Sequence, residues 1–564
     1  MILRLLRLLA VMLGAMHTWA AVRSHSMNAD GISYLDIGDA YLRGDWSAAI
    51  NSVWSPLYSW ILGLALKVTA PSMEWEFPVV HLVNFAIYLA AMACFEYFWR
   101  QVIAYKRVGL AQEDDGSATL PEWSWWILGY LLFIWSSLVL INVWSVTPDL
   151  LMATLVFLAG ALVMRIRLGL GGAGVYAALG LVLGLAYLSK SVMFLIGFVF
   201  LGAALMSASI SSRSIRRTAL ALVCFLAISL PFIGIISSAE GRLTFGDAGK
   251  LTYLRLVNGL PYPHWQGEGD SGNPEHPTRI IHVEPPIYEF GSPISGTYPV
   301  TVDPAYWYEG AVARFDLWQQ VRRLVSSAIY YFEFFFHRQA GLTIGFLILY
   351  WVATRSTVSW LGIRHYGLSL IALAVFALYA LVYVEDRYVA VFAVFFWADV
   401  FSNHRTAATG GSRSIATGIA LVITAFLLLE IAAFNLQGFQ DLSSRSARHS
   451  ETRVSGPPGW PGEVALALQQ QGLRPDEPVG VIGYAFDSYW ARLARARIVA
   501  EMFGWQAAPF WFGDDGEREG VLRAFARAGA RFIVAEHVPE NAATEGWYRV
   551  GQSNYFIYRV GSGS

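Results

Sequence analysis

Residues 26–64 read "SMNADGISYLDIGDAYLRGDWSAAINSVWSPLYSWILGL" and follow directly on the first apolar run of the chain. The stretch holds four aspartates, and the first of them, Asp30, lies only a few residues beyond that run. A carboxylate so close to a lipid bilayer is usually either a solvated loop residue or a catalytic group. The rest of the sequence is needed to choose between these two readings.

The composition is that of a membrane protein. The chain has 564 residues, of which 55% are hydrophobic and 14% charged, with a mean hydropathy of +0.45. Soluble domains carry roughly 25% charged residues. The deficit of charge, together with repeated apolar runs of about 20 residues, predicts a polytopic membrane protein. The net charge of -1 gives no indication of nucleic-acid binding. The two cysteines lie inside apolar runs and offer neither a disulfide framework nor a cysteine metal site.

The predicted fold is mainly α, a helical bundle with about eleven spans. The first run resembles a cleaved signal peptide in its length and its early arginines, but we favour a retained span because the residues after it are so informative. Basic residues in the short connections all fall on one side of the predicted bundle, which puts the N-terminus in the cytoplasm. The large segments between the predicted spans then lie on the outward side of the membrane. The apolar runs lie at about residues 3–22, 77–98, 123–141, 149–165, 172–188, 191–208, 217–238, 340–354, 366–384, 388–402 and 415–436.

Three segments on the outward side are large. The first is residues 23–76, and the second, residues 239–339, is dense in Pro, Gly, Tyr and Trp. The third is the tail, in which a polar linker at 439–460 precedes a small α/β domain at 461–564. In that domain "PVGVIGYA", "ARFIVAEHV" and "NYFIYRV" read as strands, and "EREGVLRAFARAG" reads as an amphipathic helix. Residues 1–438 then form the membrane domain.

The opening stretch predicts two helices that lie along the membrane surface. At helical spacing, Tyr34 falls on an apolar stripe, whereas Asp36 and Asp39 fall on a wet one, and Gly44 ends the helix. Asp45 reads as solvated at the end of this helix. The next apolar segment begins at Ser55-Pro56, is too short to span and is expected to lie in the interface.

These motifs resemble the GT-C superfamily of membrane glycosyltransferases. Asp30 stands at the outer end of the first span and begins a D-x-x-x-Y motif that ends at Tyr34, and "GDW" and "SPLY" follow. The nearest resemblance is to bacterial relatives of the protein O-mannosyltransferases and to the aminoarabinose transferase of lipid A, which implies a location in the bacterial inner membrane. Many members carry Asp-Glu at the first motif, whereas Gly31 follows Asp30 here, so only the role of the first carboxylate carries over.

The resemblance implies a sugar donor linked to polyprenyl phosphate and transfer outside the cytoplasm. It also points to Asp149 in "TPD", to Lys190 at the end of a G-L-x-x-L-x-K pattern, and to Arg387 with Tyr388 in "EDRY". The chemistry requires such groups, because a base must take the acceptor proton and cations must hold the departing phosphate. Asp149 could instead be a helix cap, Lys190 could reach towards headgroups, and Arg387 could form a local pair with Asp386.

Weaker candidates lie in the second outward segment. Arg242 and Lys250 occur in "GRLTFGDAGK", where glycines would allow close approach to a phosphate or sugar. The spacing of His264, His276 and His282 lacks the helical form typical of zinc sites, so no metal site is predicted. A divalent cation bridging the donor phosphate is left open as a cofactor. The aromatic residues of "DPAYWYEG" could stack on sugars or simply order the loop.

The tail shows no catalytic motif. Asp487, Arg492 and Arg495 are expected to form a solvated helix face. The domain is therefore predicted to be structural or to bind the acceptor.

The favoured function is an inverting glycosyltransferase with Asp30 as the base and with Lys190 and Arg387 on the donor phosphate. Its partners would be the lipid-linked donor, a glycan, lipid or protein acceptor, and the membrane. The alternative is a transporter or flippase of a lipid-linked sugar, which should carry repeats and polar groups near the membrane midplane. A scaffold or sensor would leave Asp30, Lys190 and Arg387 without a task. The sugar and the acceptor are not readable from the sequence.

Overall fold

The structure is a computed structural model. It describes the chain apart from residues 26, 112–121, 209, 268–277, 293, 304, 305, 307, 309, 354–366, most of 404–459, and 562–564.

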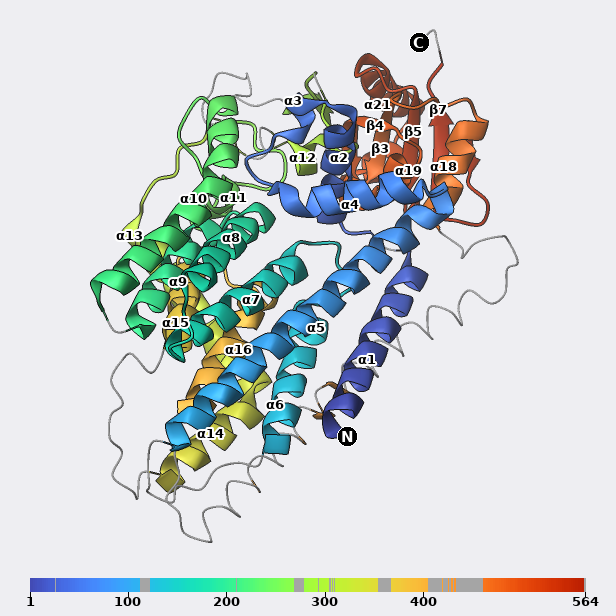
Figure 1. Cartoon of the computed structure of the whole chain (residues 1–564). Coiled ribbons are helices and arrows are strands. Elements are labelled where there is room, and N and C mark those ends of the chain that lie inside the picture. The colour runs from blue at the N-terminus through green and yellow to red at the C-terminus, as the bar shows by residue number, and fades with distance from the viewer. Residues whose placement is uncertain are drawn as a thin grey trace.

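The larger part of the molecule is a bundle of helices that run lengthwise beside one another, with a sheet at one end and the N-terminus at the other (Figure 1). We call these the sheet end and the N-terminal end. Glycines allow close packing within the bundle: a Cβ on Gly160 would lie 2.3 Å from a ring carbon of Phe395. The lengthwise helices are α1 (Ile2–Ser24), α5 (Met73–Ala111), α6 (Glu122–Ile134), α7 (Asp149–Arg167), α8 (Ala173–Ser189), α9 (Met193–Ser207), α10 (Ser212–Ala239), α14 (Ala340–Ala353), α15 (Gly367–Ala380) and α16 (Asp386–Asn403).

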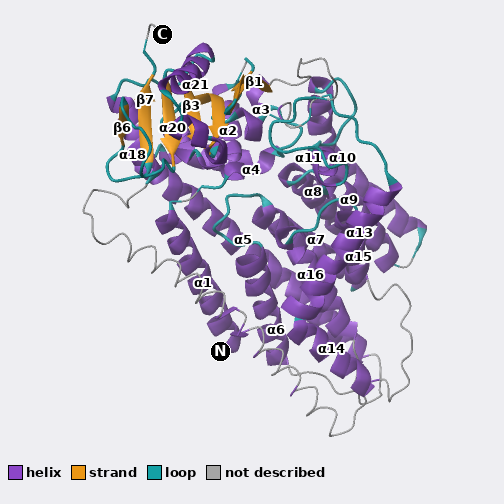
Figure 2. Ribbon diagram, turned by 180° about the vertical axis from the view of Figure 1, so that it is seen from behind, coloured by secondary structure: helices purple, strands orange, loops and turns teal. Residues whose placement is uncertain are grey.

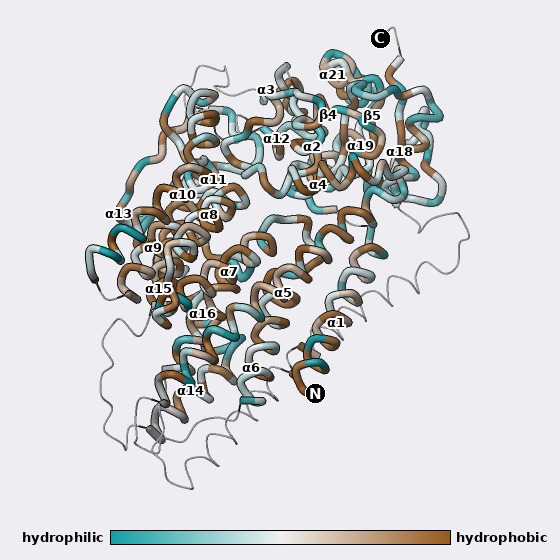
Figure 3. The backbone as a smooth tube through the Cα atoms, in the orientation of Figure 1, coloured by the Kyte–Doolittle hydropathy of each residue, from teal (hydrophilic) through white to brown (hydrophobic). Residues whose placement is uncertain are grey.

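Several of these helices are suited to a membrane. Within the described residues, five are long and apolar enough to cross it, and three shorter apolar helices accompany them at Ala173–Ser189, Met193–Ser207 and Gly367–Ala380. The hydropathy of the residues separates the bundle from the sheet end, because apolar residues dominate the bundle while the sheet end is mixed (Figure 3). The chain is thus a multi-pass membrane protein, as predicted. The five long helices are Ile2–Ser24, Met73–Val108, Glu122–Leu140, Asp149–Arg167 and Ser212–Ala239.

Some spans differ from the prediction in length. The run predicted at 77–98 is part of the much longer α5. The run at 340–354 is α14, but it is preceded by α13 (Leu317–Phe332) and a π-helical turn at Glu333–Arg338, so helix begins well before residue 340. Sequence hydropathy misses α13 because Gln and Arg side chains cover one face of it. The span predicted at 415–436 lies mostly outside the described residues.

Short helices gather at the sheet end. Helix α4 lies across the ends of the lengthwise helices and not alongside them (Figure 1). The surface position predicted for this apolar segment is consistent with that placement. The short helices are α2 (Ala29–Arg43), α3 (Trp46–Ala49), α4 (Pro56–Thr69), α11 (Ala248–Leu256) and α12 (Pro299–Val302).

One seven-stranded sheet occupies this end, in the order β1-β2-β4-β3-β5-β7-β6 (Figure 2). Strand β3 pairs in parallel with both β4 and β5, and the other pairs are antiparallel. Three strands and one helix of the tail are confirmed, whereas β4 and β6 were not predicted. The strands are β1 (Thr278–Val283), β2 (Pro286–Phe290), β3 (Pro478–Gly483), β4 (Arg497–Phe503), β5 (Phe532–Glu536), β6 (Trp547–Arg549) and β7 (Tyr555–Arg559).

The β1–β2 hairpin comes from the second outward segment and not from the tail. It joins the tail sheet through the antiparallel pairs Tyr288–Glu501 and Glu289–Ala500. Four tail helices cover the sheet: α18 (Pro461–Gln470), α19 (Tyr489–Leu493), α20 (Ala508–Phe512) and α21 (Asp515–Arg527). Two segments almost 200 residues apart in sequence therefore share one sheet.

Candidate active site

Four helix ends meet at the sheet end of the bundle and bring together four of the predicted site residues. Asp30 lies in the first turn of α2, Asp149 begins α7, Lys190 follows the last residue of α8, and Arg387 is the second residue of α16. The Arg387 guanidinium Nη1 lies 3.6 Å from Oδ2 of Asp30 and 3.5 Å from Oδ2 of Asp149. Lys190 forms an ion pair with the other oxygen of Asp149. We call these residues, with Glu385, the charge cluster.

The two aspartates of the charge cluster differ in exposure. The Asp149 side chain is 1% exposed and contacts both cations, whereas the Asp30 side chain is 37% exposed and reaches only Arg387, at the longer distance. A reactant can therefore approach Asp30 but not Asp149. Asp149 is placed to hold Lys190 and Arg387 in position.

The pKa of Asp30 is raised above its ordinary value. The main cause is the surrounding protein, which removes the carboxylate from bulk water, and Arg387 opposes the shift. A carboxylate with a raised pKa is a stronger base than a solvated one. The position and the electrostatics of Asp30 thus both suit proton transfer.

Tyr388 lies beneath one of the cations. The Lys190 Nζ is 3.7 Å from the centroid of the Tyr388 ring, a cation–π geometry. The ring in turn stacks on Tyr379, with centroids 5.3 Å apart and planes 21° apart. Tyr388 therefore adds a second favourable contact to the ammonium that Asp149 binds.

Tyr34 lies one turn after Asp30 but is buried. Its ring makes edge contacts with Trp54 and Tyr58 at 5.1 Å each. The Tyr58 hydroxyl donates to Oδ1 of Asn84 at 2.6 Å. In this conformation Tyr34 contributes to the packing of α2 and α4 around Asp30.

Asn28 ties the start of α2 to the segment before α7. Its Oδ1 accepts a hydrogen bond from the backbone N–H of Val146 at 2.9 Å, and its Nδ2 donates to the Val146 carbonyl at 3.3 Å. Asp30 and Asp149 follow these two anchor points by two and three residues, so the pair of hydrogen bonds sets their separation.

Gly31 is explained by the same close approach. A Cβ at this position would lie 2.8 Å from Cβ of Val146 and 2.6 Å from Sδ of Met27. A second acidic side chain, as many GT-C members carry, would not fit against Val146. The departure from Asp-Glu is thus a packing consequence of how α2 meets the α7 segment.

Glu385 is a member of the charge cluster that was not singled out from the sequence. Its Oε1 lies 3.1 Å from Nε of Arg387. Asp386, the neighbour that could have formed a local pair with Arg387, instead binds Arg338 and accepts a hydrogen bond from the Tyr330 hydroxyl. The signal was present in "EDR", but the sequence does not tell which acidic residue faces the arginine.

Arg242 and Lys250 lie away from these contacts. Arg242 pairs with Asp247 at 2.5 Å, and Lys250 is exposed on α11. Among the described residues, neither has a contact with the charge cluster. Their loop packs beside Lys190 instead: Gly246 approaches so closely that a Cβ there would lie 2.6 Å from Cβ of Ser191.

The histidines of the second outward segment are apart from one another. His264 pairs with Glu501 and stacks on Tyr288, with centroids 4.1 Å apart. Nδ1 of His282 lies 2.8 Å from the Pro285 carbonyl, and His276 is outside the described residues. Within the described chain no group of three His, Cys, Asp or Glu side chains could hold a metal ion. The residues present therefore do not fit a metal held by protein ligands alone.

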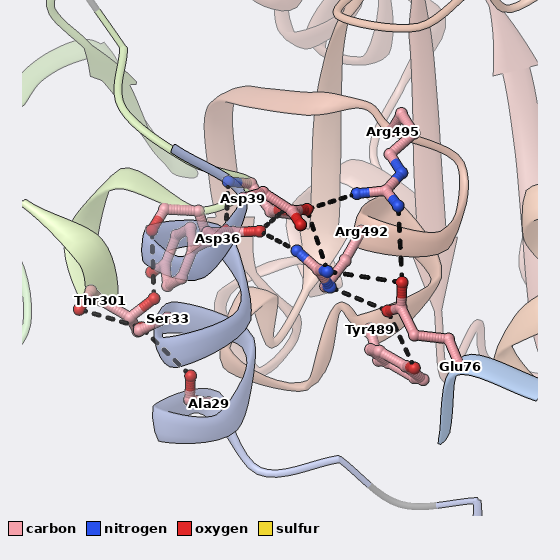
Figure 4. A network of polar contacts seen from close by, with 11 residues as sticks. Ala29, Ser33, Asp36, Asp39, Glu76, Thr301, Tyr489, Arg492 and Arg495 are labelled. Atoms are coloured by element: carbon pink, nitrogen blue, oxygen red, sulfur yellow. Dashed lines mark hydrogen bonds and ion pairs between the residues drawn. The ribbon is translucent and has the colours of Figure 1, made fainter. Parts of the chain in front are cut away.

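A second ion network joins the tail to the bundle (Figure 4). Arg492 is 1% exposed and binds Asp36 at 2.7 Å, Glu76 at 2.9 Å and Asp39 at 3.1 Å. Arg495 adds contacts to Asp39 at 2.7 Å and to Glu76 at 3.5 Å. We call these five residues the interdomain network.

The interdomain network corrects two predictions. Asp36 and Asp39 are not the wet face of a surface helix, because α19 covers them. Arg492 is not on a solvated helix face, whereas Asp487 is exposed as expected. Asp36 also accepts hydrogen bonds from the backbone N–H and the hydroxyl of Thr297. Asp45 is exposed and caps α3 by accepting the Ala48 N–H.

The fold has counterparts among solved structures. The chain has the GT-C fold that the resemblance implied. The solved structure of ArnT from Cupriavidus metallidurans in the apo state superposes with a TM-score of 0.50 at 13% identity, covering 98% of this chain and 97% of that one.

Two further solved structures are similar. ArnT from the same organism, bound to undecaprenyl phosphate, has a TM-score of 0.49 at 12% identity and covers 99% of this chain and 98% of its own. The Archaeoglobus fulgidus oligosaccharyltransferase, in complex with Zn and sulfate, has a TM-score of 0.45 at 14% identity, covering 95% of this chain and 68% of its own. No family model matches the sequence, and no curated protein matches it.

Proposed function

We propose that the protein is an inverting glycosyltransferase that moves a sugar from a polyprenyl-phosphate donor to an acceptor hydroxyl outside the cytoplasm. The observation that carries the proposal is the charge cluster, in which an accessible carboxylate and two cations from separate helices meet at one end of a GT-C bundle. The reaction needs these groups at the boundary between lipid and water, because the donor's tail stays in the bilayer.

Asp30 acts as the general base. As the acceptor oxygen forms its bond to the anomeric carbon, the hydroxyl proton passes to the Asp30 carboxylate, and the bond from that carbon to the phosphate oxygen breaks. The electron pair of the broken bond stays with the phosphate. Attack from the face opposite the leaving phosphate inverts the anomeric configuration.

Lys190 and Arg387 bind the departing phosphate. Its negative charge grows as the bond to the sugar breaks, so fixed cations stabilise the transition state more than the ground state. Arg387 offers a planar fork suited to two phosphate oxygens, whereas Lys190 supplies a point charge. Asp149 and Glu385 keep both cations in place before the donor binds, and the phosphate then competes with these carboxylates.

The distribution of basic residues supports the proposed orientation of the protein in the membrane. Arg7 and Arg100 meet at Glu96, near the N-terminal end of the bundle, and short loops rich in Arg and Lys stay in the cytoplasm. The charge cluster and the tail would then face the extracytoplasmic side of a bacterial inner membrane. The partners are the lipid-linked donor and an acceptor that approaches from the water.

Binding of the lipid phosphate tests the proposed role of Lys190 and Arg387. Undecaprenyl phosphate, which one ArnT crystal structure holds, serves as the probe, and its affinity is measured for the purified protein in nanodiscs. Lys190→Ala and Arg387→Ala should each weaken binding about 10- to 100-fold, since a hydrogen bond to a charged group is worth about 1.5–3 kcal/mol. Arg387→Lys should restore the affinity only in part, because lysine lacks the fork.

Lys67 on α4 provides the matched control, because it is exposed and lies outside the charge cluster. Lys67→Ala should bind the lipid phosphate as the wild type does. Unchanged affinity in both Lys190→Ala and Arg387→Ala would refute the phosphate site.

A further inference from the structure

The tail sheet presents one edge at which three parallel strands end together. Strand β3 ends at Gly483 beside Phe503 of β4, and its other neighbour, β5, ends at Glu536. The chain passes from β3 to β4 on one side and then crosses to β5 on the other. Open α/β sheets bind ligands outside the carboxyl ends of their strands, at the point where the strand order reverses in this way.

The helices confirm that the connections lie on opposite faces. Val479 and Val481 of β3 belong to the core that includes α18 and α19. Ile482 belongs to the core that includes α20 and α21. The β3 end is thus the place where the two halves of the sheet diverge.

Two exposed aromatic side chains follow directly on these strand ends. Tyr484, 40% exposed, follows β3, and Trp505, 65% exposed, follows β4. Trp505 stacks on Phe503 with centroids 4.3 Å and planes 12° apart, and Tyr484 stacks on Phe486 with centroids 5.0 Å and planes 30° apart. Each exposed ring thus stacks on a buried phenylalanine, which restricts its side-chain rotation.

Two carboxylates lie beside these rings, one buried and one exposed. The buried Glu536 accepts a hydrogen bond from the Tyr484 backbone N–H and holds that residue in place, and a Cβ on Gly483 would lie 2.1 Å from its Cγ. Asp487 is exposed and acts electrostatically on Tyr484. We call Tyr484, Phe486, Asp487, Trp505 and Glu536 the aromatic edge.

The aromatic edge contacts the second outward segment. The Phe486 ring lies 5.8 Å from the ring of Tyr262, and the Arg255 guanidinium lies over that same ring at 4.2 Å. Arg255 belongs to α11, so the aromatic edge is joined to α11 through Tyr262.

We propose that the aromatic edge binds a sugar ring of the acceptor, so that the acceptor is a glycan; this rests on the proposed transferase function. One face of a pyranose ring presents C–H groups that stack on an aromatic ring, while its hydroxyls point outwards and donate to carboxylates. Two exposed rings beside the exposed carboxylate of Asp487 match both features. The same carboxylate disfavours anionic headgroups and acidic peptides.

The test is binding of the full-length protein in nanodiscs to an array of immobilised neutral and acidic oligosaccharides. At least one oligosaccharide should be retained, and Trp505→Ala and Tyr484→Ala should each weaken its binding about tenfold. Tyr548→Ala is the matched control, since this tyrosine is exposed on β6 at the far side of the sheet, and it should bind as the wild type does. Thermal unfolding verifies that each variant is folded.

Undecaprenyl phosphate binding is measured on the same samples. If the protein binds undecaprenyl phosphate but retains no glycan, or if glycan binding is unchanged in both Trp505→Ala and Tyr484→Ala, the role of the aromatic edge is overturned while the proposed transferase function stands. If the protein binds no glycan but binds anionic phosphatidylglycerol vesicles, and Trp505→Ala loses that binding, the aromatic edge is a membrane contact and the proposal is also overturned. A wild-type protein that does not bind undecaprenyl phosphate would instead count against the proposed function.

Discussion

Asp30 and Asp149 are both aspartates in the first turn of a helix, yet their surroundings differ. Asp149 is buried and engaged by Lys190 and Arg387, whereas Asp30 is more exposed and is engaged by Arg387 at 3.6 Å. A base must be reached by its substrate and must be free to accept a proton. Of the two aspartates, Asp30 is therefore the one that the proposed reaction assigns as base.

The raised pKa of Asp30 predicts the pH dependence of the reaction. The base works only when it is ionised, so activity should fall as the pH is lowered through a pKa above the ordinary value of about 3.9. The acid limb of kcat/KM in the wild type should therefore lie above that value. The residual activity of Asp30→Asn should lack this limb. An acid limb at the same pH in both proteins would assign the titration to another group.

At this scale the sequence singled out four residues that the structure brings together, but it did not predict their arrangement. A charged side chain at the end of an apolar run is conspicuous, because burial there is costly. The pairing of Asp149 with both cations depends on helices that are distant in sequence. Glu385 was not singled out because three consecutive charged residues do not reveal which acidic one faces the arginine.

Helix α2 is the element that joins the two polar regions of the molecule. Asn28 fixes its start to the α7 segment, and Asp36 fixes its middle to the tail through Arg492. The prediction of a solvated polar face was wrong because the residue that covers it lies more than 450 positions later. A stripe of acidic residues has the same pattern whether water or a buried arginine faces it.

Removing Arg492 should destabilise the protein markedly. Arg492→Ala leaves Asp36 without a paired cation and leaves Asp39 and Glu76 with the half-exposed Arg495, and loss of one member of a buried ion group costs about 3–5 kcal/mol. Unfolding followed by intrinsic fluorescence should show a large loss of stability.

Arg495→Ala provides the comparison on the same network. This arginine is 48% exposed, so its loss should cost no more than about 1 kcal/mol. Equal destabilisation by the two substitutions would contradict the view that Arg492 holds the tail on α2.

On the scale of the whole molecule, the bundle and the tail form one unit around the helix ends. The β1–β2 hairpin extends the tail sheet, and the interdomain network holds the tail on α2. Hydropathy predicted the bundle well because apolar runs of membrane length are a strong signal. The shared sheet was beyond prediction, since strand pairing between distant segments leaves no periodic trace in either one.

The proposed orientation makes a prediction about access from the two sides of the membrane. Ser47 lies at the sheet end and Ser212 at the start of α10, and both are exposed. In whole cells an impermeant thiol reagent should label Ser47→Cys but not Ser212→Cys, which should react only after lysis. The wild type, with Cys94 and Cys224, supplies the background. The reverse pattern would place the charge cluster in the cytoplasm.

The central claim is that Asp30 is the base of an inverting transfer, and the most direct measurement is turnover by Asp30→Asn together with the anomeric configuration of the wild-type product. Asparagine has nearly the same shape but cannot take the proton, so turnover should fall about 10²- to 10⁴-fold while undecaprenyl phosphate still binds. The wild-type product should have the configuration opposite to that of the donor. Full activity in Asp30→Asn, or a product that retains the donor's configuration, would contradict the claim.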